Sequence, residues 1–281
     1  MGEIRDGQEE PDDVNRPEPT ARDGAGAARQ HIESRSRADY AVDLERRVAL
    51  LGFEPRRAGL PEVGINDGQA YLDKHHVERP WLSVARDSSP EVQRVFAALD
   101  QGGGHAHIRH EGWVTEEMNE RRVRNLEDPA QLDPAKRVAR VDGVRIGDQP
   151  HRCGSTVTRI TDPEAFAMAF ARGVVHPDVR SALDSSGPVP KPVSLLISDV
   201  LGDDGHKFCS GWRLEPVNGS MLEAVANRAA WVGGNRNVPE PWTRPVETFE
   251  GGTVTYVFRA GAAGSHEIST MYLDPPDEQM M

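Results

Sequence analysis

The chain has 281 residues and a net charge of −12, with 33 Lys and Arg against 45 Asp and Glu. Such a chain lacks the broad positive field that gives most nucleic-acid-binding proteins their non-specific affinity, so a polynucleotide would need a local basic groove. No apolar run approaches the ~20 residues of a membrane span, and two cysteines are too few for a disulfide framework. A reduced, cytoplasmic compartment is the default expectation.

The composition predicts three parts: an N-terminal tail, a short segment with one helix and a connector, and one domain. Residues 1–36 are charged, rich in Gly, Pro and Arg, and almost free of large apolar side chains, which predicts a disordered tail. Residues 37–88 are expected to form a short helix around "YAVDLERRVALLGF" and then an irregular connector without a sustained hydrophobic period. Residues 89–277 are expected to form an α+β domain.

Capping residues predict several helices in the first part of that domain. Ser89 and Pro90 begin "SSPEVQRVFAALDQ", and Thr115 begins a helix through "EEMNERRVRNLE". Asp162 begins "TDPEAFAMAFARGV", which is expected to end at Gly173, and "HPDVRSALD" predicts a shorter helix.

The segment 126–150 is predicted to be irregular.

After residue 191 the sequence pattern changes from helices to strands. "VSLLISDVLGDDGHKFCSGWRLEP" predicts two strands around a Gly-Asp-Asp-Gly turn, and "VETFEGGTVTYVFRAGAAGSHEISTMYLDP" predicts further strands between glycine turns. Helices followed by strands favour an α+β fold with an antiparallel sheet.

Three histidines lie within six residues in "QGGGHAHIRHEGWV": His105, His107 and His110. Their H-x-H-x-x-H spacing occurs in zinc hydrolases of the metallo-β-lactamase type. In that pattern an Asp precedes the last histidine, whereas this chain has Arg109, a permanent cation that cannot bind a metal. A zinc-dependent hydrolase is one alternative, and a non-catalytic partner-binding domain, favoured by the acidity, is another.

The same stretch, together with later motifs, resembles the RNase A-like toxin domain at the C-termini of contact-dependent inhibition proteins. The motifs are a Gly-Gly-His, a second histidine, a helix bearing an Arg, the Thr-Asp start of a later helix in "TRITDPEAFAMAF", and a Thr-x-Tyr pair in "EISTMYLDP". They span residues 102–276 here, so the resemblance implies an RNase A-like fold with insertions around 126–150 and 184–245.

This resemblance implies a metal-independent endoribonuclease without a cofactor, with RNA as substrate and an immunity protein as partner. The implied site consists of His110 as the principal acid/base residue, His105 as its partner or a structural residue, Arg121 on the phosphate, and the hydroxyls of Thr270 and Tyr272. Imidazole titrates near neutral pH, which suits transfer of the 2′-hydroxyl proton. Each residue taken singly also has an ordinary structural explanation.

The geometry of this site can be specified further. Strand alternation places Thr270 and Tyr272 on one face. Arg121 is expected to reach the cleft, held by Glu117 four residues earlier, while Arg122 points elsewhere. Since one phosphate must join these groups, His110 is expected within about 10 Å of Thr270 or Tyr272.

Overall fold

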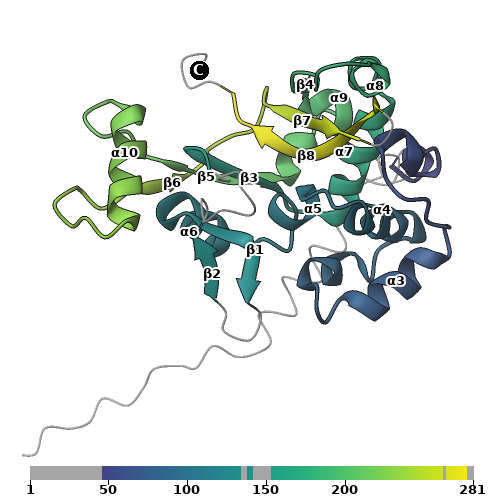
Figure 1. Ribbon diagram of the computed structural model, residues 1–281, viewed down its shortest axis with the longest axis horizontal. Coiled ribbons are helices and arrows are strands. Elements are labelled where there is room, and N and C mark those ends of the chain that lie inside the picture. The colour runs from purple at the N-terminus through teal and green to yellow at the C-terminus, as the bar shows by residue number, and fades with distance from the viewer. Residues whose placement is uncertain (1–45, 134–137, 142–152, 262–263, 277–281) are drawn as a thin grey trace, which may run out of the picture. The chain divides into compact units, whose positions relative to one another are not determined.

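The computed structural model describes residues 46–133, 138–141, 153–261 and 264–276 (Figure 1). The predicted tail at 1–36 lies outside these residues, as do the first residues of the helix predicted from Tyr40. Within the described part, no helix combines the length and the apolar character that crossing a bilayer requires.

The segment before residue 89 is helical and belongs to the core. A helix covers 46–51, and η1 (Pro55–Ala58), α3 (Asp67–His75) and η2 (Pro80–Ala85) follow it. Leu72, Leu82 and Ala85 are fully buried in the same hydrophobic cluster as α4 (Pro90–Gln101). The irregular connector expected in the second part of 37–88 instead contains three short helices. Isolated apolar residues of short helices can fill a core without producing a sustained hydrophobic period.

The capped helices form where they were predicted. Ser89 accepts a hydrogen bond from the Val92 N–H at 3.4 Å at the start of α4. Thr115 caps α6 (Glu116–Asn125), and Asp162 caps α7 (Pro163–Val175) by accepting from Ala165 at 2.7 Å. The remaining helices of this part are α5 (Ala106–Arg109) and α8 (Pro177–Asp184).

Gly173 does not end α7, contrary to expectation. The helix continues to Val175, and a Cβ at Gly173 would collide with the ring and hydroxyl of Tyr256. That hydroxyl donates a 2.6 Å hydrogen bond to the carbonyl of Ala169. Glycine is thus required here because a buried tyrosine packs directly on the helix backbone.

All strand pairs in the described part are antiparallel, and they form three sheets. Two strands, β1 (Glu127–Asp133) and β2 (Val138–Val141), pair with each other. A second sheet has the order β3-β5-β6, and a third has the order β4-β7-β8. The bounds of these six strands are β3 (Thr156–Ile160), β4 (Val193–Leu196), β5 (Cys209–Leu214), β6 (Thr243–Pro245), β7 (Thr253–Ala260) and β8 (His266–Asp274). The α+β class is confirmed.

The order of elements differs from the prediction in three places. Segment 126–150, expected to be irregular, contains β1 and β2, and β3 also precedes α7, so helices and strands alternate. The predicted hairpin over 193–214 is wrong: α9 (Ile197–Leu201) and η3 (Gly205–Phe208) separate β4 from β5, which pair in different sheets. The sequence pattern did not reveal α10 (Met221–Val232).

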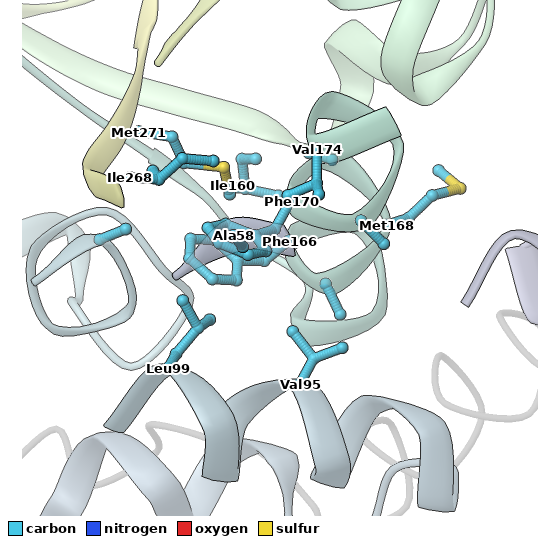
Figure 2. Close-up of a cluster of buried hydrophobic side chains, with 14 of the residues drawn as sticks. Ala58, Val95, Leu99, Ile160, Phe166, Met168, Phe170, Val174, Ile268 and Met271 are labelled. Carbon is cyan, nitrogen blue, oxygen red and sulfur yellow. The ribbon is translucent and has the colours of Figure 1, made fainter. Parts of the chain in front are cut away.

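The core surrounds α7, as Figure 2 shows. Phe166 of α7 packs on Phe96 of α4 with ring centroids 5.6 Å apart, and Ile268 and Met271 of β8 enter the same cluster. This packing fixes β8 relative to α4. The chain leaves α4 through the glycines and histidines of 102–110, so the core also determines where those histidines meet β8.

Candidate functional site

A cavity of about 440 Å³ lies between β3, β8 and the segments that carry the histidines. Four of the five predicted site residues line it: His105, His110, Thr270 and Tyr272. The fifth, Arg121, does not, and Arg122 lines the cavity instead. Residues 153–158 and 273–274 complete the wall.

A bulge in β8 holds His105 in place. In the β7–β8 register Val257 pairs with Thr270 and Phe258 with Ile268, so Ser269 has no opposite residue. Its carbonyl accepts a 3.2 Å hydrogen bond from the backbone N–H of His105. A bulge releases a backbone group from the ladder, and here that group attaches the glycine turn beside Thr270.

Arg259 fastens the same turn from the other strand. Its guanidinium donates to the carbonyls of Gly102 at 2.7 Å and Gly103 at 3.2 Å, and it pairs with Glu267 at 3.0 Å. Gly103 has φ = +70°, a left-handed conformation that glycine adopts without strain. The three glycines therefore form a defined connection between α4 and the site.

His110 is held at both its backbone and its ring. Its N–H donates to Ala106 at 2.9 Å, and its carbonyl accepts from Ile160 at 3.0 Å. The ring Nδ1 lies 3.0 Å from the carbonyl of Thr158. A carbonyl can only accept, so Nδ1 carries the proton and the neutral ring keeps its lone pair on Nε2.

The ring of His110 also lies close to Tyr272, with centroids 6.0 Å apart. This separation confirms the expectation that His110 lies within about 10 Å of the Thr-x-Tyr pair. Burial lowers the pKa of His110 well below its usual value, and the charge of Arg122 lowers it further, with smaller effects from His105 and Arg109. The hydrogen bond with Thr158 opposes these effects only in part. His110 is consequently a neutral imidazole at neutral pH.

The two neighbouring arginines of α6 lie opposite to the prediction: Arg122 lines the cavity and Arg121 faces solvent. The predicted pair of Arg121 with Glu117 forms, at 3.7 Å, but a second pair with Glu127 at 2.7 Å holds Arg121 on the solvent side, 42% exposed. Arg122 is only 3% exposed. The expectation that Arg122 points elsewhere is wrong, because Asn119, Arg122 and Val123 form the inner face of α6.

Thr270 and Tyr272 bring two hydroxyl groups to the cavity. Both side chains line it from alternate positions of β8, and Thr270 is 8% exposed. Burial raises the pKa of Tyr272, and Asp274 raises it further, so the phenol keeps its proton and can donate a hydrogen bond. The Asp274 carboxylate, at the end of β8, accepts from the Thr255 hydroxyl at 2.7 Å.

Two residues that support the cavity were not anticipated from the sequence. The Thr158 hydroxyl donates to the Leu273 carbonyl at 2.8 Å and accepts from the Leu273 N–H at 3.1 Å, which ties β3 to β8. Arg228 of α10 is 2% exposed and donates to the carbonyl of Gly154 at 2.8 Å. The sequence signal that could have identified Arg228 is its position within "EAVANRAAW", a mostly apolar helical stretch, which indicates a buried arginine.

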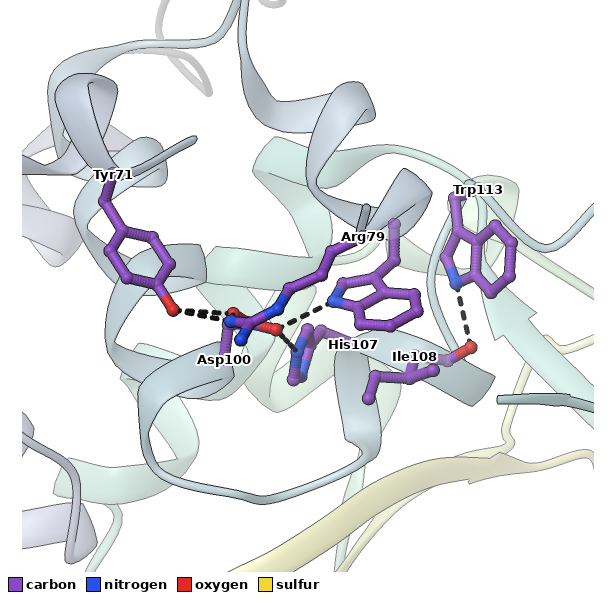
Figure 3. Close-up of polar contacts among 7 residues, drawn as sticks. Tyr71, Arg79, Asp100, His107, Ile108 and Trp113 are labelled. Atoms are coloured by element: carbon purple, nitrogen blue, oxygen red, sulfur yellow. Dashed lines mark hydrogen bonds and ion pairs between the residues drawn. The ribbon is translucent and has the colours of Figure 1, made fainter. Parts of the chain in front are cut away.

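His107 takes no part in this cavity. It is fully buried, and its Nε2 lies 3.5 Å from Asp100 Oδ1 (Figure 3). Asp100 also accepts 2.8 Å hydrogen bonds from the hydroxyl of Tyr71 and the indole of Trp81, and it pairs with Arg79. We call these five residues the Asp100 network.

The Asp100 network bears directly on the zinc alternative. His107 binds within it, while His105 and His110 line the cavity, so the three histidines do not share one site. In the described ranges no three His, Cys, Asp or Glu side chains are grouped to hold a metal ion. Arg109, which occupies the position of the zinc pattern's Asp, instead donates from Nε to Asp128 at 2.9 Å and fixes α5 to β1.

Glu111, next to His110, is a completely buried carboxyl group. Its Oε2 accepts from the Trp113 N–H at 3.0 Å, and burial raises its pKa to about 8. The folded protein therefore keeps a proton that the unfolded chain releases near pH 4.5. The free energy of unfolding should fall as the pH rises between these two values, by about 3 kcal/mol at pH 7.

We expect Glu111→Gln to abolish this fall in the free energy of unfolding with rising pH, because glutamine keeps the shape of the side chain and cannot ionise. Urea unfolding should find the variant more stable than the parent at pH 7 to 8, with the difference nearly gone at pH 4.5. Glu117→Gln, on the exposed side of α6, is the control. A stability difference independent of pH would show that Glu111 is ionised in the folded protein.

Comparisons with protein-family models, with curated proteins and with solved structures found no match to this chain. The functional interpretation of the cavity therefore depends on the residues that line it and on their geometry.

Proposed function

We propose that this chain is a metal-independent endoribonuclease that cleaves RNA through attack by the 2′-hydroxyl group. The observation that carries the proposal is the composition of the cavity. Two histidines from 105–110, a buried arginine from α6 and two hydroxyls from β8 line one space, although the histidines and the hydroxyls are about 160 residues apart in the sequence. Acid, base and phosphate donors around one space are what this reaction requires.

His110 is a neutral imidazole with its lone pair on Nε2, which suits a general base. Nε2 removes the proton from the 2′-hydroxyl, the 2′-oxygen attacks phosphorus, and the bond to the 5′-oxygen breaks. His105, the second cavity imidazole, donates a proton to that leaving oxygen. The products are a 2′,3′-cyclic phosphate and a free 5′-hydroxyl, so no external nucleophile, metal or cofactor is needed.

Arg122, Thr270 and Tyr272 supply the donors for the phosphate. Charge develops on the non-bridging oxygens during attack, and a buried guanidinium stabilises it more strongly than an exposed one would. The protonated phenol of Tyr272 and the Thr270 hydroxyl add neutral donors. In this proposal Arg122 replaces Arg121 as the phosphate ligand.

The proposal extends to the relationship with RNase A-like toxin domains. The order of the motifs supports it: the Gly-Gly-His turn, the second histidine, the arginine helix, the Thr-Asp helix start and the Thr-x-Tyr strand. An RNase A-like fold with insertions, a toxic activity inside a target cell, an immunity protein as partner and a cytoplasmic site of action follow from that relationship as further proposals.

The test is cleavage of an end-labelled RNA by the purified chain in the presence of EDTA. We expect fragments ending in 2′,3′-cyclic phosphate, and an intact DNA of the same sequence, because DNA has no 2′-hydroxyl. Cleavage that requires added divalent metal would favour a metal-dependent hydrolase, and an inert chain would overturn the proposal.

Arg122→Gln should lower kcat/KM by about 100-fold, on the usual worth of one buried donor to a developing charge. The acid limb of the pH profile should also move to higher pH, because the charge that lowers the pKa of His110 is gone. Arg122→Lys should keep the acid limb and recover part of the rate.

Arg121→Gln is the matched control on the same helix, and neither the rate nor the pH profile should change. Circular dichroism and thermal unfolding check the fold of each variant. If Arg121→Gln were the damaging change, the role assigned here to Arg122 would be refuted.

A further inference from the structure

Asp274 places a carboxylate in the wall of a cavity that is proposed to bind a phosphate. The residue is exposed at the end of β8, and it lines both this cavity and a second one, of about 630 Å³, that adjoins it. Among the described residues the carboxylate has one partner, the Thr255 hydroxyl, which donates to Oδ2 at 2.7 Å. The cleavage chemistry uses neither this carboxylate nor the second cavity.

A chain of hydroxyl groups across three strands fixes the orientation of the Asp274 carboxylate. Thr255 of β7 is 3% exposed and donates its only hydroxyl proton to Asp274. The Ser194 hydroxyl of β4 therefore donates to Thr255, over 2.8 Å. Each carboxylate oxygen can accept two hydrogen bonds, so Oδ2 keeps one acceptor position and Oδ1 keeps both. Asp274 thus offers a ligand two oriented acceptors.

The order of side chains along β8 determines which part of a substrate lies next to Asp274. Thr270, Tyr272 and Asp274 are alternate residues that all line the cavity, and successive members of this row are about 7 Å apart. The backbone of His105 is attached beside Thr270, and the His110 ring lies beside Tyr272. His105, His110 and Asp274 therefore follow one another along the strand.

This order distinguishes the two nucleotides that flank the cleaved bond. In the proposed reaction His110 acts on the 2′-hydroxyl of the nucleotide on the 5′ side, and His105 acts on the oxygen that leaves. The 5′-side nucleotide therefore lies toward Asp274, and its base extends to the second cavity. The wall of that cavity includes apolar side chains that can contact the base: Leu214, Pro216, Met221, Pro275 and Pro276.

Guanine is the base whose edge matches a carboxylate. It has two neighbouring donors, N1–H and the N2 amino group, and a carboxylate accepts two parallel hydrogen bonds from such a pair. Adenine and cytosine have an acceptor nitrogen beside the amino group, and uracil has its N–H between two carbonyls. Each of these three bases would direct an acceptor at an oxygen of the carboxylate, and two facing acceptors repel each other.

We propose that Asp274 selects guanosine as the nucleotide on the 5′ side of the cleaved bond, by accepting hydrogen bonds from N1–H and N2–H of the base. This inference rests on the proposed ribonuclease function. The cleavage products then end in guanosine 2′,3′-cyclic phosphate. The carboxylate also disfavours the other three bases, so it provides selection by repulsion as well as by attraction.

Cleavage of the four dinucleotides GpA, ApA, CpA and UpA tests the selection. The parent should cleave GpA with a kcat/KM about 10-fold or more above the others, on the usual worth of a hydrogen bond to a charged group. IpA, whose inosine lacks the N2 amino group, should fall between GpA and ApA. Equal rates on all four dinucleotides would overturn the inference.

Asp274→Asn keeps the size of the side chain and replaces one acceptor by a donor. It should lower kcat/KM for GpA by about 10-fold or more and should not lower it for ApA or CpA. Thr255→Val, which removes the orienting hydroxyl, should reduce the guanosine preference only in part. Asp199→Asn makes the same charge change at an exposed position of α9 and should change no rate. A guanosine preference that survives in Asp274→Asn would overturn the role of Asp274.

A binding experiment separates this inference from the proposed function. Isothermal titration calorimetry should find that 3′-GMP binds about 10-fold or more tightly than 3′-AMP, and that Asp274→Asn removes the difference. Binding of 3′-GMP that depends on Asp274, by a chain that leaves RNA intact, would overturn the ribonuclease and keep the guanine site. RNA cleavage together with equal binding of the two nucleotides would overturn the guanine site alone.

Discussion

Replacement of His110 by alanine should lower RNA cleavage by about 100-fold or more, which is the usual contribution of a general acid or base. Nε2 is the nitrogen available to substrate, because Nδ1 donates to the Thr158 carbonyl. Alanine keeps the backbone hydrogen bonds to Ala106 and Ile160, so the fold should persist. Single-turnover kinetics with saturating enzyme would measure the effect on the chemical step.

His206→Ala provides the control. Its Nδ1 also lies 3.0 Å from a backbone carbonyl, that of Asp203, but the residue is outside the cavity. We expect this variant to cleave RNA at the parental rate. If the two variants lost activity equally, or if His110→Ala were fully active, His110 would not be the base.

The largest loss of stability is expected at Asp100. Asp100→Asn should lower the free energy of unfolding by about 3 kcal/mol, since an uncharged amide cannot pair with Arg79 and the side chain is only 4% exposed. Burial alone would raise the pKa of Asp100, but hydrogen bonds from His107, Trp81 and Tyr71 lower it below its usual value. Urea unfolding at pH 7 measures the difference.

Tyr71→Phe removes two hydrogen bonds of the same network, the one that the hydroxyl donates to Asp100 and the one that it accepts from Arg79, and should cost about 2 kcal/mol. Because the Asp100 network is separate from the cavity, both variants should retain cleavage under conditions where they are folded. Loss of activity in a folded Asp100→Asn protein would show instead that His107 and its neighbours act on the site.

Sequence patterns within a few residues predicted the helix starts and the final hairpin, because neighbouring residues determine these features. Ser89, Thr115 and Asp162 cap helices because a side-chain oxygen within three residues satisfies a free N–H. The β7–β8 hairpin follows from alternation around a glycine turn. The class α+β could be inferred from such elements together.

Long-range pairing could not be inferred in the same way. The segments at 193–196 and 209–214 each have the composition of a strand, but nothing local states that β4 pairs with β7 and β5 with β3. A short connection usually joins neighbouring strands, and α9 breaks that rule here. The strand at 156–160 was missed because five residues carry too weak a pattern.

The candidate site was predicted better than the topology, except for its arginine. The order of the motifs predicted that His105, His110, Thr270 and Tyr272 lie close together, and all four line one cavity. An ion pair between Glu117 and Arg121 was taken as a sign that Arg121 faces inward, yet such pairs form on solvent-facing sides of helices. Val123, the β-branched apolar residue of α6, marks the inner face and would have indicated its neighbour Arg122.

The double hydrogen bond between Thr158 and Leu273 has a consequence for when the protein can act. It joins sheets whose strands come from distant parts of the chain, and the same residue holds the ring of His110. Contacts between distant segments form late and slowly during folding. Neither the nascent N-terminal part nor any fragment ending before residue 270 contains both halves of the site. The proposed ribonuclease activity should therefore appear only after β3 and β8 have come together in the folded protein.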